Sequence, residues 1–213
     1  MKQNKPPKTT WQTIAPILLK RYKREKSYLD YNAPWELLIA VILSAQTTDD
    51  GVNKITPELF RQYPTPALLA KGSEIHIAKI IRPIGYYNAK ARYIKATAKI
   101  LTEKFGGQVP QTEAELLTLP GVGRKTAVVI LANLFNQHVG ISTDTHVIRF
   151  ANRFGFSHSQ NAAIVERDMC AVIPQKDWHK AGYAIKEYGR REGKARGYLP
   201  ENDPLWLACG SIE

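Results

Sequence analysis

The sequence predicts an all-α fold, and two observations carry that prediction. Apolar residues recur with the spacing of amphipathic helices over most of the chain, while no stretch sustains the period-two alternation of a half-buried strand. Pro and Gly interrupt the pattern at short intervals, as they do between short helices. The 213 residues, 44% of them hydrophobic and 23% charged, suffice for a globular protein with a sizeable core.

The first half of the chain is expected to form short helices. Residues 10–26 form a basic helix, with cations crowding the C-terminal end, where they suit the helix dipole. Residues 34–45 form a helix almost free of polar side chains, which is typical of one buried on most sides. Its first residue, Pro34, is well tolerated at that position. Further helices are predicted at residues 50–63, 65–71 and 73–81.

The second half continues in the same way. Residues 88–105 form a longer helix with one apolar stripe, and Gly106 and Gly107 end it. From residue 192 onward the chain becomes rich in Gly, Pro and charged residues, and the helical signals fade. The remaining predicted helices are at residues 112–117, 127–135, 144–154, 161–172 and 178–191.

The charge balance points to a polyanionic partner. Thirty Lys and Arg against 19 Asp and Glu give a formal net charge of +11 and a pI near 9.6. Such an excess attracts nucleic acid and speeds encounter with it. The alternative interpretation is a generically basic protein with no such partner.

The number of cysteines and the hydropathy of the chain indicate in which cellular compartment the protein is expected. Two cysteines, Cys170 and Cys209, cannot build a disulfide framework, which fits a reducing environment. No segment has the length of a signal-peptide core or of a membrane span. We therefore expect a cytoplasmic monomer that is associated with the nucleoid through DNA and has no membrane partner.

The most informative segment reads Leu-Pro-Gly-Val-Gly-Arg-Lys-Thr at residues 119–126. Gly121 and Gly123 allow a tight hairpin, and the apolar helix that follows opens with free amides that can hold a phosphate. Arg124, directly after the second glycine, adds positive charge. The pattern predicts a helix-hairpin-helix that grips DNA phosphates without reading bases. A plain helical turn is the alternative, since Gly and Pro punctuate many connections.

Lys125 lies in the first turn of the helix after this hairpin. Most lysines are solvated surface charges, but the positive helix end and neighbouring cations here favour a neutral, nucleophilic amine. Such an amine can attack the sugar C1′, expel the base and form a Schiff base. The imine acidifies the C2′ proton, and β-elimination then breaks the 3′ phosphodiester. One residue would thus supply both glycosylase and lyase activity.

Asp144 stands in the segment Thr-Asp-Thr-His at residues 143–146, just before an apolar helical run. Its simplest role is to cap that helix. Its functional role would be a carboxylate that stabilises oxocarbenium character at the sugar and moves protons to and from the amine. The two roles are compatible, because a capping aspartate is held rigidly.

Together these motifs resemble the endonuclease III family of the helix-hairpin-helix DNA glycosylase superfamily. The resemblance covers roughly residues 30–196. It implies a two-lobed all-α fold with the DNA groove between the lobes, and base flipping of the damaged nucleotide. One lobe, of six helices, is expected at residues 27–137, and the second at residues 1–26 plus 138–213. The similarity extends to residues 36–49 (Glu-Leu-Leu-Ile-Ala-Val-Ile-Leu-Ser-Ala-Gln-Thr-Thr-Asp), 52–54 (Val-Asn-Lys), 85–90 (Gly-Tyr-Tyr-Asn-Ala-Lys), 143–149 (Thr-Asp-Thr-His-Val-Ile-Arg) and 189–190 (Gly-Arg).

The resemblance also assigns roles to individual residues. It places Lys125 at the nucleophile position and Asp144 at the aspartate position. Gln46 matches the glutamine that fills the void left by the flipped base, although an N-cap or core amide is the alternative. Tyr86 stands where the family usually has a leucine wedge, and its Gly-Tyr-Tyr context is closer to that of adenine glycosylases; a tyrosine can still wedge by stacking on a base.

For two residues that follow Asp144, the sequence does not decide between a functional and a structural role. His146 and Arg149 follow it along the same helix. Each is a candidate for contact with the substrate or a phosphate, and for each a purely structural role is an equal alternative.

One departure from the family concerns the iron–sulfur cluster. Members commonly bind a [4Fe–4S] cluster through Cys-x6-Cys-x2-Cys-x5-Cys, and such clusters need four thiolates. That spacing falls here on Gly193, Pro200, Asp203 and Cys209, so only the last ligand position remains. We expect no cluster, no metal and no other cofactor.

The segment around residues 190–196 keeps the positive charge of a DNA-binding loop through Arg190, Arg191, Lys194 and Arg196. Without a metal, its order would come from packing. The candidate packing residues are Tyr198, Leu199, Leu205 and Trp206.

The sequence thus predicts a DNA repair glycosylase with AP lyase activity on oxidised pyrimidines in duplex DNA, bound to damaged bases or abasic sites. A glycosylase for mismatched uracil, thymine or adenine is one alternative. A non-catalytic DNA-structure-binding protein that has inherited the scaffold is another.

Overall fold

The computed structural model describes residues 9–24 and 26–210, and in this part of the chain it contains helices and no strand. The expected all-α fold is confirmed. The α-helices are α1 (Trp11–Arg21), α2 (Pro34–Leu43), α3 (Asp49–Gln62), α4 (Pro66–Lys71), α5 (Glu74–Ile80), α6 (Tyr87–Lys104), α7 (Glu113–Leu116), α8 (Arg124–Phe135), α9 (Thr145–Arg153), α10 (Ala162–Val172), α11 (Trp178–Arg191) and α12 (Pro204–Gly210), with short 3-10 turns η1 (Gln175–Asp177) and η2 (Pro200–Asn202).

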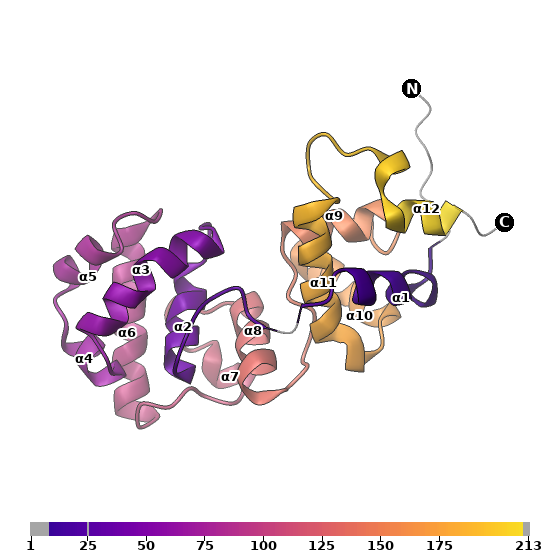
Figure 1. Ribbon diagram of the computed structural model, residues 1–213. Helices are drawn as coiled ribbons and strands as arrows, with labels where there is room; N and C mark the ends of the chain where they lie inside the picture. Colours follow the sequence, from indigo (N-terminus) through magenta and orange to yellow (C-terminus); the bar gives the residue numbers. More distant parts are fainter. Residues whose placement is uncertain (1–8, 25, 211–213) are drawn as a thin grey trace. The chain divides into compact units, whose positions relative to one another are not determined.

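The helices form two compact units, each with its own core (Figure 1). The central unit comprises Ser27–Gln137 and contains α2 to α8. The terminal unit comprises Met1–Lys26 together with His138–Glu213 and contains α1 and α9 to α12. The two chain ends therefore contribute to one unit, because α1 packs against both α11 and α12.

Helix α2 is the centre of the central unit. Every residue from Trp35 to Leu43 is buried, because α3, α6 and α8 pack around this helix. The carboxylate of Glu36 accepts hydrogen bonds from the backbone N–H groups of Asn32 (2.7 Å) and Ala33 (3.3 Å) and so fixes the start of the helix. A nearly all-apolar helix is stable here since it is surrounded by other helices.

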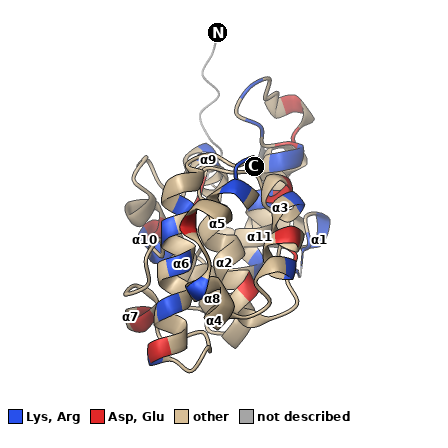
Figure 2. Ribbon diagram, turned by 90° about the vertical axis from the view of Figure 1, so that its left-hand side faces the viewer, with Lys and Arg blue, Asp and Glu red and all other residues tan. Residues whose placement is uncertain are grey.

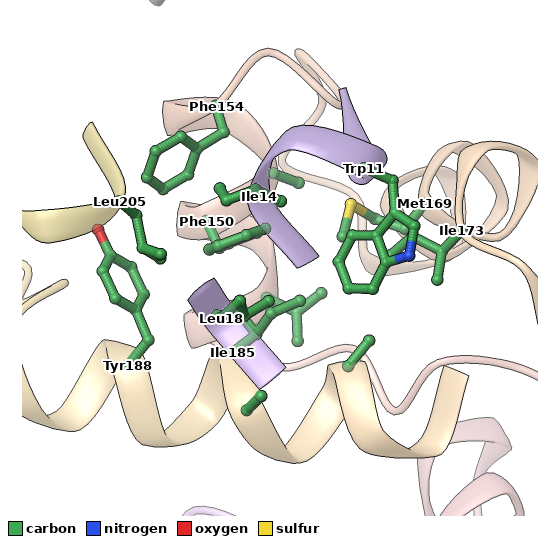
Figure 3. Packing of buried hydrophobic residues seen from close by; sticks show 14 of the residues in the cluster. Trp11, Ile14, Leu18, Phe150, Phe154, Met169, Ile173, Ile185, Tyr188 and Leu205 are labelled. Atoms are coloured by element: carbon green, nitrogen blue, oxygen red, sulfur yellow. The ribbon is translucent and has the colours of Figure 1, made fainter. Parts of the chain in front are cut away.

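The terminal unit has an aromatic core (Figure 3). Phe150 of α9 and Phe154, the C-cap of that helix, pack against Tyr188 of α11, with Leu18 of α1 buried beside them. The rings meet edge-on or tilted, with centroids 4.9–6.0 Å apart, which is the favoured geometry for aromatic pairs. Leu205 of α12 is fully buried in the same cluster.

Two expectations about the ends of the chain need correction. Helix α1 stops at Arg21 rather than continuing to residue 26, because its C-cap Tyr22 is the last buried residue there and only charged residues follow up to residue 26. The C-terminal segment forms α12, although the helical signals there are weak; Leu205 and Trp206 pack against the core. Leu199 does not share that packing role, since 51% of it is exposed.

Within the described residues, no helix is both long enough and apolar enough to cross a membrane.

Candidate active site

The hairpin before α8 is built by two glycines with different tasks. Gly121 has a φ of +80°, and a Cβ there would lie 3.0 Å from Ile42 Cγ2 and 3.1 Å from Tyr93 Cβ. Gly123 has an ordinary extended backbone and is the N-cap of α8, with open space around a Cβ. Only Gly121 is therefore required by both backbone angle and close packing.

Other contacts hold the hairpin in place within the central unit. The Val122 N–H donates to the Leu119 carbonyl at 3.1 Å, and the Thr97 hydroxyl of α6 donates to the Pro120 carbonyl at 2.9 Å. Val122 is buried. The amides at the start of α8 are thus presented by a turn that is anchored to the unit's longest helix.

A matched pair of alanine substitutions separates the two glycines. Gly121→Ala is expected to destabilise the protein by about 1–3 kcal/mol, because it forces a side chain into the left-handed region and against Ile42 and Tyr93. Gly123→Ala is expected to cost less than about 1 kcal/mol, as an N-cap substitution without a clash. Urea denaturation of both variants measures the difference; equal losses would contradict the assigned geometry.

Lys125 is the second residue of α8 and is exposed. Its neighbour Arg124 forms an ion pair with Glu113 of α7, with 2.5 Å between guanidinium nitrogen and carboxylate oxygen. Of the two cations that follow the hairpin, Arg124 is thus already engaged with an acid of the same unit. The amine of Lys125 projects from the first turn of a helix, where backbone N–H groups have no intrahelical acceptor.

Asp144 belongs to the terminal unit and is the N-cap of α9. Its Oδ1 accepts hydrogen bonds from the backbone N–H groups of His146 (2.8 Å) and Val147 (3.1 Å). The expected capping role is therefore present. One carboxylate oxygen carries both of these bonds, and the side chain is held rigidly while still partly exposed.

His146 and Arg149 engage the structure around them. A Cβ at Gly189 of α11 would overlap the His146 ring, so glycine is needed there for α9 and α11 to approach. Burial lowers the pKa of His146. The Arg149 guanidinium contacts His146 Nδ1 at 3.0 Å, the Gly193 carbonyl at 2.8 Å and the Thr145 carbonyl at 3.3 Å. These contacts assign both residues a structural task.

Gln46 and Tyr86 share an uncommon backbone conformation in the central unit. Their φ values are +53° and +57°, in the left-handed region that non-glycine residues seldom adopt. Both are exposed, Tyr86 to 69%. Tyr86 also precedes α6 as its N-cap residue. Strained positions of this kind cluster at functional sites.

Lys90 connects these two positions and was not singled out from the sequence. Its ammonium donates to the Thr47 hydroxyl at 2.7 Å, and its backbone N–H donates to the Tyr86 carbonyl at 3.0 Å. Only 4% of Lys90 is exposed, and burial lowers its pKa. One sequence signal could have found it, since Lys90 lies one helical turn before Ile94 on the buried face of α6.

The basic residues near the end of α11 have unequal surroundings. The Arg191 guanidinium donates to the Arg21 carbonyl at 3.3 Å and lies 4.0 Å from Glu192. Lys194 and Arg196 follow the helix in an exposed loop. Figure 2 shows Lys and Arg in blue on helices of both units, in keeping with their excess over Asp and Glu.

The residues at the four cluster-ligand positions do not fit an iron–sulfur cluster. Gly193, Pro200 and Asp203 supply no thiolate, and a Cβ at Gly193 would overlap the Tyr188 ring. Cys209 is buried, and burial raises the pKa of its thiol, which disfavours the thiolate that a metal needs. Among the described residues, no three His, Cys, Asp or Glu side chains lie together in a way that could hold a metal ion.

Comparisons with known proteins agree with this picture of the hairpin and its flanking helices. Residues 39–175 match the HhH-GPD superfamily of base excision DNA repair proteins. Endonuclease III of Synechocystis sp. is 44% identical over 197 residues, which cover 92% of this chain and 90% of that protein.

Two solved structures are also similar. A non-covalent endonuclease III–DNA complex superposes with a TM-score of 0.87 at 37% identity, covering 94% of this chain and 95% of that one. A trapped endonuclease III–DNA covalent intermediate, an estranged-adenine complex, gives a TM-score of 0.85 at 36% identity and covers 91% of each chain. The chain belongs to the HhH-GPD superfamily of base excision DNA repair proteins and, within it, to the endonuclease III family.

Proposed function

We propose that this protein removes oxidised pyrimidines from duplex DNA and then cleaves the resulting abasic site, with Lys125 as its nucleophile. As a member of the endonuclease III family it is a base excision repair DNA glycosylase with AP lyase activity, and its partner is damaged duplex DNA. The observation that carries the assignment to Lys125 is its place as an exposed amine in the first turn of α8, directly after the hairpin.

The proposed reaction begins with the neutral amine of Lys125. Its lone pair forms a bond to C1′ while the bond from C1′ to the base breaks, and the base leaves with that electron pair and takes up a proton. The C1′–O4′ bond then breaks as a proton passes from the attached amine to O4′, which opens the sugar ring and leaves an iminium that acidifies C2′. Loss of a C2′ proton then expels the 3′ phosphate by β-elimination, and water releases the lysine. The solved endonuclease III–DNA covalent intermediate supports a covalent route of this kind.

Asp144 would assist at the same sugar. Its carboxylate, held by two backbone N–H groups of α9, supports positive charge as the glycosidic bond weakens and accepts protons from the amine. Because the hydrogen bonds are made by Oδ1, the second oxygen is left for this task. A fixed carboxylate needs little reorganisation when charge develops.

Gln46 and Tyr86 are proposed to hold the duplex open around the flipped nucleotide. Their exposed side chains and left-handed backbones suit residues that project from a fixed turn. The hairpin amides around Gly121 and Gly123, with Lys194 and Arg196, are proposed to bind phosphates. Five further residues remain candidates for contacting DNA next to these positions: Arg124, His146, Arg149, Arg190 and Arg191.

We further propose that the enzyme works without an iron–sulfur cluster, as a cytoplasmic monomer on the nucleoid. The chain contains two cysteines where four thiolates are needed, and three of the four ligand positions carry other residues. No step of the reaction above depends on a metal.

A panel of duplexes, each with one lesion, tests the substrate class. We expect base release and strand cleavage from thymine glycol and 5-hydroxycytosine at rates at least about tenfold above those from mismatched uracil, thymine or adenine. Tyr86 in its Gly-Tyr-Tyr context makes adenine the comparison of most interest. Faster excision of mismatched adenine would replace the proposed substrate, and tight binding with no excision of any lesion would favour the non-catalytic alternative.

A further inference from the structure

The loop of residues 193–199, which follows Glu192 and leads to η2, must be held in place without a metal. It carries Lys194 and Arg196 and contains no acidic residue, and most of its side chains are exposed. The loop therefore buries too little apolar surface to order itself, and contacts at its ends must do so.

A buried carboxylate anchors the C-terminal end of this loop through hydrogen bonds. Asp203 is 1% exposed, and its Oδ2 accepts hydrogen bonds from the hydroxyls of Tyr188 (2.5 Å) and Tyr198 (2.6 Å). Its Oδ1 accepts a third from the backbone N–H of Leu205 at 2.9 Å. The carboxylate thus ties α11, the loop and α12 together. In Figure 3 the Tyr188 side chain extends from α11 toward Leu205.

Arginines of α9 hold the beginning of the loop. Arg153 donates to the Tyr188 hydroxyl at 3.0 Å and to the Lys194 carbonyl at 3.3 Å, and its guanidinium lies 3.4 Å from the centroid of the Tyr198 ring. Arg149 donates to the Gly193 carbonyl at 2.8 Å. The positive charge of Arg153 also compensates the buried Asp203 carboxylate through the tyrosine between them.

Burial and the Asp203 carboxylate keep both tyrosines protonated. Burial is the larger cause and the hydrogen bond to Asp203 the second in raising the pKa of Tyr188 and of Tyr198. Each hydroxyl therefore remains a donor to the carboxylate across the physiological pH range.

We infer that Arg153, Tyr188, Tyr198 and Asp203 form a polar clamp, the Asp203 clamp, that positions Lys194 and Arg196 for contact with DNA phosphates. Asp203 occupies a position at which the cluster spacing calls for a cysteine, and the Tyr188 ring takes the space that a Cβ at residue 193 would need. The inference rests on the proposed function in two respects, that the protein binds DNA and that it lacks a cluster. It adds the residues that replace the metal as the anchor of the loop.

The DNA affinity of variants without Asp203 distinguishes a role of the clamp in positioning the loop from the effect of removing one negative charge. Removing an acid from a basic protein should strengthen binding to a polyanion, whereas breaking the clamp should weaken it. The probe is a fluorescent duplex with a tetrahydrofuran abasic analogue, titrated at several salt concentrations. Asp203→Asn is expected to raise Kd about five- to tenfold and to lower the salt slope by about 1–2.

Glu201→Gln is the matched control. Glu201 is an exposed carboxylate two residues away, in η2, and no contact of the clamp involves it. Its substitution removes the same charge and is expected to leave Kd unchanged or slightly lower. Should Asp203→Asn fail to fold, Tyr198→Phe removes one hydroxyl but keeps the ring beneath Arg153, and it is expected to raise Kd about two- to threefold.

A double-mutant cycle shows whether the clamp acts through the loop. The variant Lys194→Ala/Arg196→Ala removes the two loop cations and leaves the clamp residues in place. If the clamp positions these cations, adding Asp203→Asn to this variant changes Kd by less than about twofold. Additive losses would overturn the clamp as a positioning device, as would an unchanged Kd in both Asp203→Asn and Tyr198→Phe.

The same samples separate failure of the clamp from failure of the proposed function. Iron content and visible absorbance of the wild-type protein test the absent cluster: stoichiometric iron would overturn that proposal and the clamp with it. An iron-free protein with an additive cycle would overturn the clamp alone. KM and kcat add a check, because Asp203→Asn should act mainly on KM, and a loss confined to kcat would contradict a role in phosphate contact.

Discussion

Lys125→Ala is expected to abolish the covalent adduct that borohydride traps between this protein and DNA containing an abasic site. Without the amine no iminium forms at C1′, so there is nothing for the hydride to reduce. Strand cleavage should fall by at least about a thousandfold, as expected for loss of a nucleophile. Denaturing gel electrophoresis after borohydride treatment measures the adduct directly.

The fold should survive this substitution, because Lys125 is exposed on the first turn of α8 and alanine is a good helix former. Lys99→Ala is a suitable control in the same unit. Lys99 is an exposed lysine of α6 whose ion pair with Glu103 spans 3.8 Å, so its loss should cost only a few tenths of a kcal/mol and leave the adduct intact. An adduct of undiminished yield in Lys125→Ala would assign the nucleophile to another amine.

Asp144 has two roles that a pair of substitutions can separate. Asp144→Asn keeps an oxygen that can accept from the His146 and Val147 N–H groups but removes the negative charge. We expect base excision to fall about 10²- to 10³-fold at nearly unchanged stability, since asparagine is also a good N-cap. Single-turnover kinetics on a thymine glycol duplex and thermal denaturation measure the two effects.

Asp144→Ala removes the cap as well as the charge. It should show the same loss of excision rate and, in addition, a loss of about 1 kcal/mol of stability. If Asp144→Asn retained full activity while Asp144→Ala lost it, the contribution of Asp144 would be the rigidity of α9 and not its charge.

Local patterns predicted most of the helices. The hairpin, the N-cap of α9 at Asp144 and the apolar α2 each carry their signal in residues that are neighbours in sequence, so spacing and residue type suffice to find them. Prediction was weaker where a helix end depends on packing. Helix α1 ends at Arg21, directly before Tyr22, the last buried residue of that segment, and α12 forms because Leu205 enters a core made by other helices.

The sequence did not predict which group each cationic side chain contacts in the folded protein. Arg124, Arg149 and Arg153 look alike as members of a basic chain, yet the fold engages them with Glu113, Gly193 and Tyr188 respectively. These partners are separated from them in sequence by a turn, a helix or more. Lys194 and Arg196, by contrast, extend from an exposed loop.

The sequence by itself determined the reactive groups and the turns that present them, because a glycine hairpin and a helix cap are built by consecutive residues. The tertiary structure alone decided what anchors the C-terminal loop. Residues 153, 188, 198 and 203 meet around one buried carboxylate, and no periodicity or spacing indicates that meeting. Their contacts arise when α9, α11 and α12 pack over a shared aromatic core, which is a property of the folded chain.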